Sequence, residues 1–160
     1  MVAAHSALGL RAVAAYELAS CWHLDASRDR VWDVLEGGLA GPDPMPWWPQ
    51  VRTIGRGRDH VVLRTRSRLG YALTFRLHDL RTSPPDRMAF AADGDLRGRG
   101  SLVFREVDAD TSILDIRWDV DVDRRWMRLT SPLLRHVFVV AHANVMRTGE
   151  RHLNAWLATH

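Results

Sequence analysis

The sequence predicts an α+β domain in which a curved antiparallel sheet of about seven strands wraps around one long C-terminal helix, with a short helical segment after the first strand. Three observations predict it. Apolar and polar residues alternate over most of residues 16–122. Turn residues separate the alternating runs, and the period changes to that of a helix over about residues 126–158. The short connections exclude parallel crossovers, so the strands form an antiparallel meander.

The first strand is expected from Tyr16 to Asp25, where side chains alternate between two faces. Ser27 is a suitable N-cap for a short helix over residues 28–35, and Gly37 and Gly38 are expected to end it.

Residues 41–49 contain four prolines and therefore form neither a long helix nor a central strand. Trp47 and Trp48 lie in this loop as adjacent residues, so their indoles are expected to point in different directions, with one of them exposed.

Residues 51–122 hold the meander, and its last run is the clearest. Leu114, Ile116 and Trp118 alternate there with Asp115 and Arg117, which predicts a sheet with one apolar and one charged face. The expected strands span residues 51–56, 59–68, 71–82, 87–94, 97–107 and 112–122.

The C-terminal helix has to cover the apolar face, and one helix is only about 10 Å wide. Seven strands at about 4.8 Å spacing are more than 30 Å across. The sheet must therefore curl around the helix, and Gly94, Gly98 and Gly100 are suited to the bends this requires. Such an arrangement predicts an apolar pocket between the sheet and the helix.

Composition fits one domain over residues 16–160, preceded by an extension at residues 1–15. All 22 basic residues are Arg, and 19 acidic residues leave a net charge of only +3. No apolar run reaches the roughly 20 residues that span a bilayer. The single cysteine, Cys21, permits no internal disulfide and is expected to be at least half-buried, so a cytoplasmic location is favoured.

Three stretches resemble the SRPBCC superfamily, the START-like or Bet v 1-like group with the helix-grip fold. Residues 24–35 read LDASRDRVWDVL, residues 47–51 read WWPQV, and residues 98–104 read GRGSLVF. The resemblance covers about residues 16–158 and implies the helix-grip fold. It leaves activity open, because this superfamily includes enzymes, carriers and stress proteins.

The favoured function is binding of a small hydrophobic molecule, namely a lipid, an isoprenoid or an aromatic polyketide. Residues on the inner face of the sheet, in the Trp-containing loop and along the apolar stripe of the helix are expected to bind it. They are Trp22, Trp47, Trp48, Leu63, Thr65, Phe75, Phe90, Phe104, Ile116, Trp118, Leu134, Phe138, Ala141 and Val145.

The first alternative is an enzyme that uses the same pocket, a polyketide cyclase, aromatase or dehydratase of the lyase or isomerase type. Such a reaction needs an acid/base pair, for which Tyr71 and His142 are the candidates. The histidines and the single cysteine lack metal-ligand spacing, and no phosphate-binding glycine loop follows a strand, so neither a metal nor a cofactor is expected.

The second alternative is an interaction protein that uses an Arg-rich outer sheet face. Arg64, Arg66 and Arg68 share one face of a strand and could bind the phosphates of a nucleic acid or an anionic membrane. An ordinary solvated face is the favoured interpretation, because few aromatic residues are interleaved for base stacking. The oligomeric state, monomer or homodimer, stays open.

Overall fold

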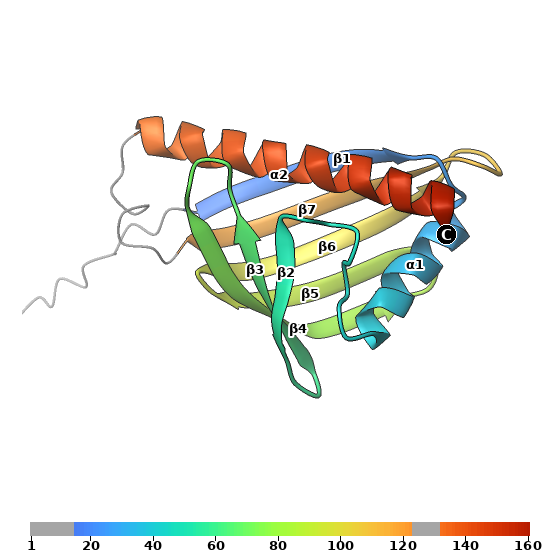
Figure 1. The fold of residues 1–160 in the computed structure, drawn as a ribbon, viewed down its shortest axis with the longest axis horizontal. Helices are drawn as coiled ribbons and strands as arrows, with labels where there is room; N and C mark the ends of the chain where they lie inside the picture. The colour runs from blue at the N-terminus through green and yellow to red at the C-terminus, as the bar shows by residue number, and fades with distance from the viewer. Residues whose placement is uncertain (1–14, 123–131) are drawn as a thin grey trace, which may run out of the picture.

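The computed structural model describes residues 15–122 and 132–160, and it confirms the helix-grip architecture (Figure 1). One sheet of seven antiparallel strands has the order β1-β7-β6-β5-β4-β3-β2. The N-terminal extension, up to residue 14, and the start of the predicted C-terminal helix, residues 126–131, lie outside the described residues. The elements are β1 Ala15–Leu24, α1 Arg28–Ala40, β2 Val51–Arg56, β3 His60–Arg66, β4 Ala72–Ser83, β5 Arg87–Gly94, β6 Leu96–Glu106, β7 Ser112–Val122 and α2 Pro132–Thr159.

The register of the sheet aligns inward-facing positions of neighbouring strands. Leu18 pairs with Trp118, which pairs with Gly100, which in turn pairs with Phe90. Alternation along each strand therefore becomes one continuous apolar surface on the concave side, and the opposite side carries most of the charged residues.

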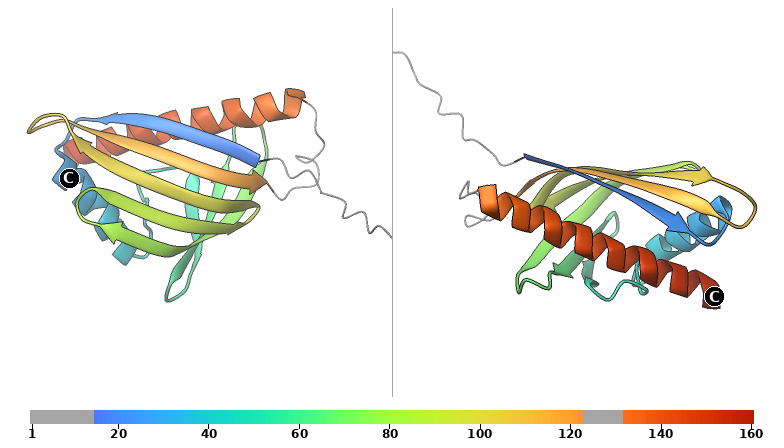
Figure 2. Two further views of the ribbon diagram at one scale, coloured as in Figure 1. Left: turned by 180° about the vertical axis from the view of Figure 1, so that it is seen from behind. Right: turned by 90° about the horizontal axis from the view of Figure 1, so that it is seen from above.

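Bulges and glycines bend the sheet. The pairing register shifts between Thr53 and Gly55 on β2 and between His78 and Arg81 on β4. Gly94 has a φ of 112°, a backbone conformation that side chains other than glycine rarely adopt. The resulting curvature brings β2 and β3 around toward the helix side, as Figure 2 shows from behind and from above.

Helix α2 runs along β1, at one edge of the sheet, on the concave side (Figures 1 and 2). Its polar side chains bond to the backbone at the end of β1. Glu150 accepts from the backbone N–H of His23 at 2.7 Å, and Asn154 both donates to the carbonyl of His23 and accepts from the N–H of Asp25, each at 2.9 Å. Leu153, on the same turn of the helix, is completely buried in the hydrophobic core. Within the described part of the chain, no helix combines the length and apolarity needed to cross a membrane.

Helix α1 begins at its predicted N-cap, because the Ser27 hydroxyl accepts from the N–H of Arg30 at 3.4 Å. It ends at Ala40 rather than at residue 35, so the prediction that Gly37 and Gly38 terminate it was wrong. Two glycines cost a helix about 2 kcal/mol in total. That cost is offset by Leu39, which packs against the core, and by tight packing at Gly38, where a Cβ would lie 2.3 Å from the Pro44 carbonyl oxygen.

Cys21 lies on the convex face and is exposed, which contradicts the expectation of burial. Its strand partner is Asp115, and the two side chains form a hydrogen bond. Partial loss of hydration and this carboxylate both raise the pKa of the thiol, so Cys21 stays protonated at neutral pH.

Replacing Gly98 on β6 with alanine should destabilise the protein. The residue has a φ of 155°, and a Cβ there would lie 1.9 Å from the carbonyl oxygen of Asp119 on the neighbouring strand. We expect Gly98→Ala to lower the free energy of unfolding by at least about 2 kcal/mol, measured by urea denaturation. Gly37→Ala is the matched control, because no atom lies within 4 Å of its added Cβ. It should be neutral or stabilising by up to about 1 kcal/mol. Equal stability of the two variants would contradict the role assigned to Gly98.

Candidate ligand-binding cavity

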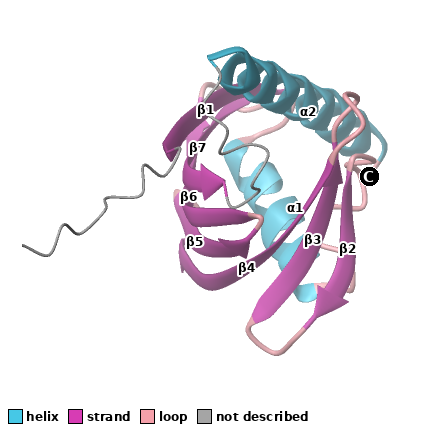
Figure 3. Ribbon diagram, turned by 90° about the vertical axis from the view of Figure 1, so that its left-hand side faces the viewer, coloured by secondary structure: helices cyan, strands magenta, loops and turns pink. Residues whose placement is uncertain are grey.

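A cavity of about 370 Å³ lies inside the curl of the sheet. The concave faces of β1 to β7, the N-terminal half of α2, α1 and the Trp-containing loop line it. Figure 3 looks into the curl of the sheet, with α1 behind the strands. This volume falls in the range of sites that hold small organic molecules. The hollow predicted from the widths of sheet and helix is thus present.

The first wall of the cavity is a cluster of three indoles from β1 and the loop before β2. Trp47 and Trp48 stack nearly parallel, with ring centroids 5.4 Å apart and planes 12° from parallel. Trp22 meets the Trp48 ring edge-on at 5.4 Å. The expectation that Trp47 and Trp48 point in different directions, with one exposed, was wrong, since Trp47 is buried and Trp48 half-buried.

Two local features hold this stack. The N–H of Trp48 donates to the carbonyl of Met45, and the N–H of Val51 donates to the carbonyl of Trp48, so the loop forms tight turns. Gly149 on α2 lies directly against the stack, because a Cβ at that position would be 2.6 Å from Trp48 and 2.8 Å from Trp22.

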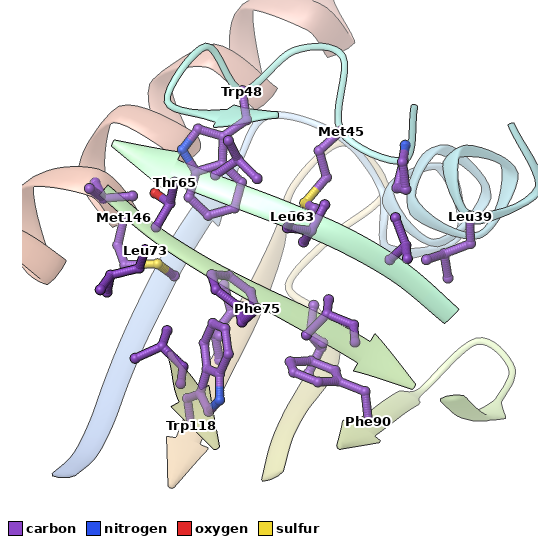
Figure 4. A pocket seen from close by; sticks show the side chains of 18 of the residues that line it. Leu39, Met45, Trp48, Leu63, Thr65, Leu73, Phe75, Phe90, Trp118 and Met146 are labelled. Carbon is purple, nitrogen blue, oxygen red and sulfur yellow. The ribbon is translucent and has the colours of Figure 1, made fainter. Parts of the chain in front are cut away.

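The opposite wall is a second aromatic cluster on the sheet. Trp118 meets Phe75 at 5.3 Å and Phe90 at 5.5 Å, both edge-on (Figure 4). Gly100, between Phe90 and Trp118 in the register, has no side chain, and the Phe90 ring occupies the space that its Cβ would fill. Edge-on contacts of this kind fix the orientation of each ring.

The polar groups of the interior include four buried indole N–H groups without a hydrogen-bond partner among the described residues, those of Trp22, Trp47, Trp48 and Trp118. The hydroxyl of Tyr71 forms a hydrogen bond with Ser67, and burial raises the pKa of Tyr71. Burial lowers the pKa of His142 to about 4. Thr65 Oγ1 is buried without a hydrogen-bond partner among the described residues. The phenol therefore stays protonated and the imidazole uncharged at neutral pH.

The mouth of the cavity is marked by the four lining residues whose side chains are exposed. Arg56, Arg58 and Asp59 come from the hairpin between β2 and β3, and Leu80, 46% exposed, follows the bulge of β4. The Arg56 guanidinium donates to the carbonyls of Leu39 and Gly41 and so ties this hairpin to the C-terminal end of α1. Charged side chains thus line the rim of the cavity while neutral groups line its interior.

Most residues that the sequence nominated for ligand binding line the cavity, and both catalytic candidates, Tyr71 and His142, do so too. Phe104 does not line it, because its ring packs against Trp32 at 5.0 Å in the core beneath α1. The side chain of Leu134 lies outside the described part of the structure. The nominated residues that line the cavity are Trp22, Trp47, Trp48, Leu63, Thr65, Phe75, Phe90, Ile116, Trp118, Phe138, Ala141 and Val145.

Sequence reasoning missed several lining residues. Leu35 and Leu39 reach the cavity from α1, and Met45 reaches it from the loop (Figure 4 labels Leu39 and Met45). Leu39 lies beyond the two glycines that were expected to end the helix, and Met45 lies between prolines, so no periodic signal marked either. Leu73 on β4 alternates with outward residues and could have been found from its strand pattern.

No group of three or more His, Cys, Asp or Glu side chains in the described ranges is arranged to hold a metal ion. The interior described above offers hydrogen bonds, neutral acid/base groups and aromatic surfaces.

No family model matches the sequence, and neither does any curated protein. Solved structures do match, and at their low sequence identities they establish the shared fold. The Zhui aromatase/cyclase from a Streptomyces species has a TM-score of 0.65 and 16% identity, over 90% of this chain and 94% of that one. A START superfamily protein from Mycobacterium smegmatis has a TM-score of 0.63 and 12% identity, over 89% and 97%. The di-domain aromatase/cyclase StfQ from the steffimycin biosynthetic pathway has a TM-score of 0.55 and 14% identity, over 86% of this chain and 50% of that one.

The buried His142 should make stability depend on pH. The pKa of this imidazole is about 4 in the folded protein and near 6.5 when solvated, so between these values the unfolded chain binds more protons. Stability is therefore complete above pH 6.5 and falls as the pH drops toward 4, by up to about 3 kcal/mol.

Urea unfolding across this pH range measures the effect. His142→Leu should remove most of the acid slope, whereas His136→Leu, at an exposed site on the same helix, should keep it. An unchanged slope in the His142 variant would show that its imidazole titrates normally.

Proposed function

We propose that this protein binds a small, uncharged, flat hydrophobic molecule in the cavity between the sheet, α1 and α2. The observation that carries the proposal is an interior walled by two aromatic clusters, Trp22/Trp47/Trp48 and Phe75/Phe90/Trp118, whose charged lining residues are confined to the mouth. The similarity in fold to START-like and aromatase/cyclase structures supports it.

The electrostatics favour an uncharged ligand over a fatty acid. Transferring a carboxylate from water into an apolar interior costs several kcal/mol unless a cation compensates it. The interior groups Thr65, Ser67, Tyr71 and His142 are neutral at pH 7, and the nearest lining cations are Arg56 and Arg58 at the rim. An acid bound here would have to keep its carboxylate at the mouth.

The aromatic walls favour a ligand with fused or conjugated rings over a flexible acyl chain. Ring contacts contribute about 0.5–1.5 kcal/mol each beyond the area they bury, and a rigid ligand loses little conformational entropy on binding. Of the classes that the sequence suggested, an aromatic polyketide combines flat rings with carbonyl oxygens. Those oxygens can accept from Thr65, whose hydroxyl lacks a partner within the described structure.

Native mass spectrometry of the purified protein should reveal a copurified small molecule, and titration with anthraquinone and with stearate should show a preference for the flat, neutral probe. We expect anthraquinone to bind at least about tenfold more tightly, a difference of about 1.4 kcal/mol. Failure of both probes to bind would refute ligand binding, and preferential binding of stearate would refute the ligand class.

The cavity floor offers a second prediction for the same assay. A Cβ at residue 100 would lie 2.2 to 2.9 Å from ring atoms of Phe90, so Gly100→Ala should push that ring into the cavity. Affinity for anthraquinone should fall at least about tenfold, with a smaller effect on stability because the clash is with a side chain. Gly55→Ala is the matched control, since its Cβ would make ordinary 3.5 Å contacts with Val62. Undiminished affinity in the Gly100 variant would place the ligand elsewhere.

A second candidate function is catalysis of enolisation and dehydration in the same cavity. Tyr71, kept protonated, donates a hydrogen bond to a ligand carbonyl, and neutral His142 accepts a proton from the adjacent carbon to give an enolate. The imidazolium then returns its proton to a departing hydroxyl, which leaves as water. Both residues line the cavity, and two of the structures with a similar fold are named aromatase/cyclases.

Proton exchange at the central carbon of benzoylacetone in D₂O, followed by NMR, tests this candidate. Tyr71→Phe and His142→Ala should each slow the protein-catalysed exchange by about 10²-fold while changing the affinity for the probe only slightly. Exchange no faster than in buffer, together with tight binding, would identify a binding protein without this activity. Unchanged exchange in both variants would exclude these residues as the acid/base pair.

A further inference from the structure

On the outer face of β4 to β7, arginines alternate with acidic residues, and two of them form ion pairs. Arg76 pairs with Asp93 and Arg105 with Asp115, each at 2.7 Å. Arg99 lies directly opposite Asp119 in the strand register. Across β4 to β7 this face is thus a mixed surface of the kind that stays in solvent.

The hairpin formed by β2 and β3 differs. Arg52 and Arg64 lie directly opposite each other, Arg66 follows on the same face, and Arg68 lies in the turn after β3. All four are exposed, and among the described residues none of their guanidinium groups forms an ion pair or hydrogen bond. Like charges opposite each other on neighbouring strands destabilise a sheet, so the stability of the fold does not account for this cluster of arginines.

Acidic residues are absent from β3 and from the part of β4 that pairs beside these arginines. Asp95 accepts a hydrogen bond from the backbone N–H of Thr74, the residue opposite Arg64, at 2.8 Å. Its carboxylate is thus engaged with the backbone, and no acidic residue occurs between His60 and His78. The four guanidinium groups are therefore available to an external anion.

Two large apolar side chains flank these arginines. Ile54, at the bulge of β2, is 54% exposed, and Leu69, in the turn after β3, is 58% exposed. Residues 51–70 contain no Phe, Trp or Tyr on which a nucleic-acid base could stack. Basic residues beside exposed apolar side chains are typical of a surface that meets anionic lipid, and the missing aromatic residues disfavour a nucleic acid.

We propose that this basic face, formed by Arg52, Arg64, Arg66, Arg68, Ile54 and Leu69, docks on an anionic membrane surface. The turn of the same hairpin, with Arg56, Arg58 and Asp59, forms the mouth of the cavity. Docking would place this hairpin, and with it one edge of the mouth, on the side of the protein that faces the membrane. The purpose of docking rests on the proposed function, whereas the docking itself does not.

Cosedimentation of ligand-free protein with vesicles tests the proposal. We expect binding to phosphatidylcholine vesicles that contain about 30% phosphatidylserine and none to pure phosphatidylcholine. Binding should weaken steeply as the salt concentration rises from about 0.05 M to about 0.5 M. Arg64→Glu/Arg66→Glu should lower the partition coefficient at least about tenfold, and Arg64→Gln/Arg66→Gln by a smaller factor.

Arg147→Glu/Arg151→Glu, which makes the same change in net charge at exposed sites on α2, is the matched control and should bind nearly as the unmodified protein does. Leu69→Ser should weaken vesicle binding while leaving retention on a cation-exchange resin unchanged. Circular dichroism confirms that each variant is folded.

Equal loss of vesicle binding in Arg64→Glu/Arg66→Glu and in Arg147→Glu/Arg151→Glu, or no binding to phosphatidylserine vesicles at low salt, would overturn the proposal. Binding of single-stranded DNA that depends on Arg64 and Arg66, without vesicle binding, would overturn it in favour of a nucleic-acid partner. Anthraquinone affinity is measured without vesicles, so failure of docking and failure of ligand binding are separate results.

Discussion

A disparity in width between one helix and seven strands governs this structure. Helix α2 lies along β1 and is fixed there by Glu150 and Asn154, whose side chains bond to the backbone at the end of that strand. The remaining strands can bury their apolar faces only by curving back over the helix, with α1 and the loop before β2 filling one end. The cavity is the volume that this closure leaves, so its position follows from the same constraint that folds the chain.

Neutral and charged side chains line different parts of the cavity. Burial lowers the pKa of His142 to about 4 and raises the pKa of Tyr71, so both half-buried side chains are neutral at pH 7. Charged side chains lie at the hairpin, where Arg56 also binds the last carbonyls of α1. The same physical effect favours the neutral ligand proposed above and leaves the charged groups at the mouth.

The sequence predicted the strands and the long helix well, because alternation and helical periodicity report directly on burial. The alternating residues around Trp118 and the apolar stripe of the C-terminal helix, which contains Phe138 and Ala141, correctly predicted residues on both sides of the cavity. Contacts that form only when distant segments of the chain fold together left no periodic signal in the sequence. Leu39 lies past two glycines that the fold tolerates because the loop at Pro44 packs against Gly38.

Two further differences have the same origin. Phe104 alternates correctly with its neighbours, but α1 covers its end of the strand, so its ring meets Trp32 rather than the cavity. Trp47 and Trp48 stack because the turns around Met45 and Val51 and the close approach of Gly149 bring both rings to one side. Neither the covering helix nor these turns can be deduced from residue type alone.

The parallel indoles of Trp47 and Trp48 also have a spectroscopic consequence. Their transition dipoles are close enough to couple, and both rings border the space assigned to the ligand. A conjugated guest there would quench their emission and alter the near-ultraviolet dichroism of the coupled pair. Tryptophan fluorescence and near-ultraviolet circular dichroism can therefore report whether a compound binds in the cavity, and candidate compounds can be screened without attaching a dye.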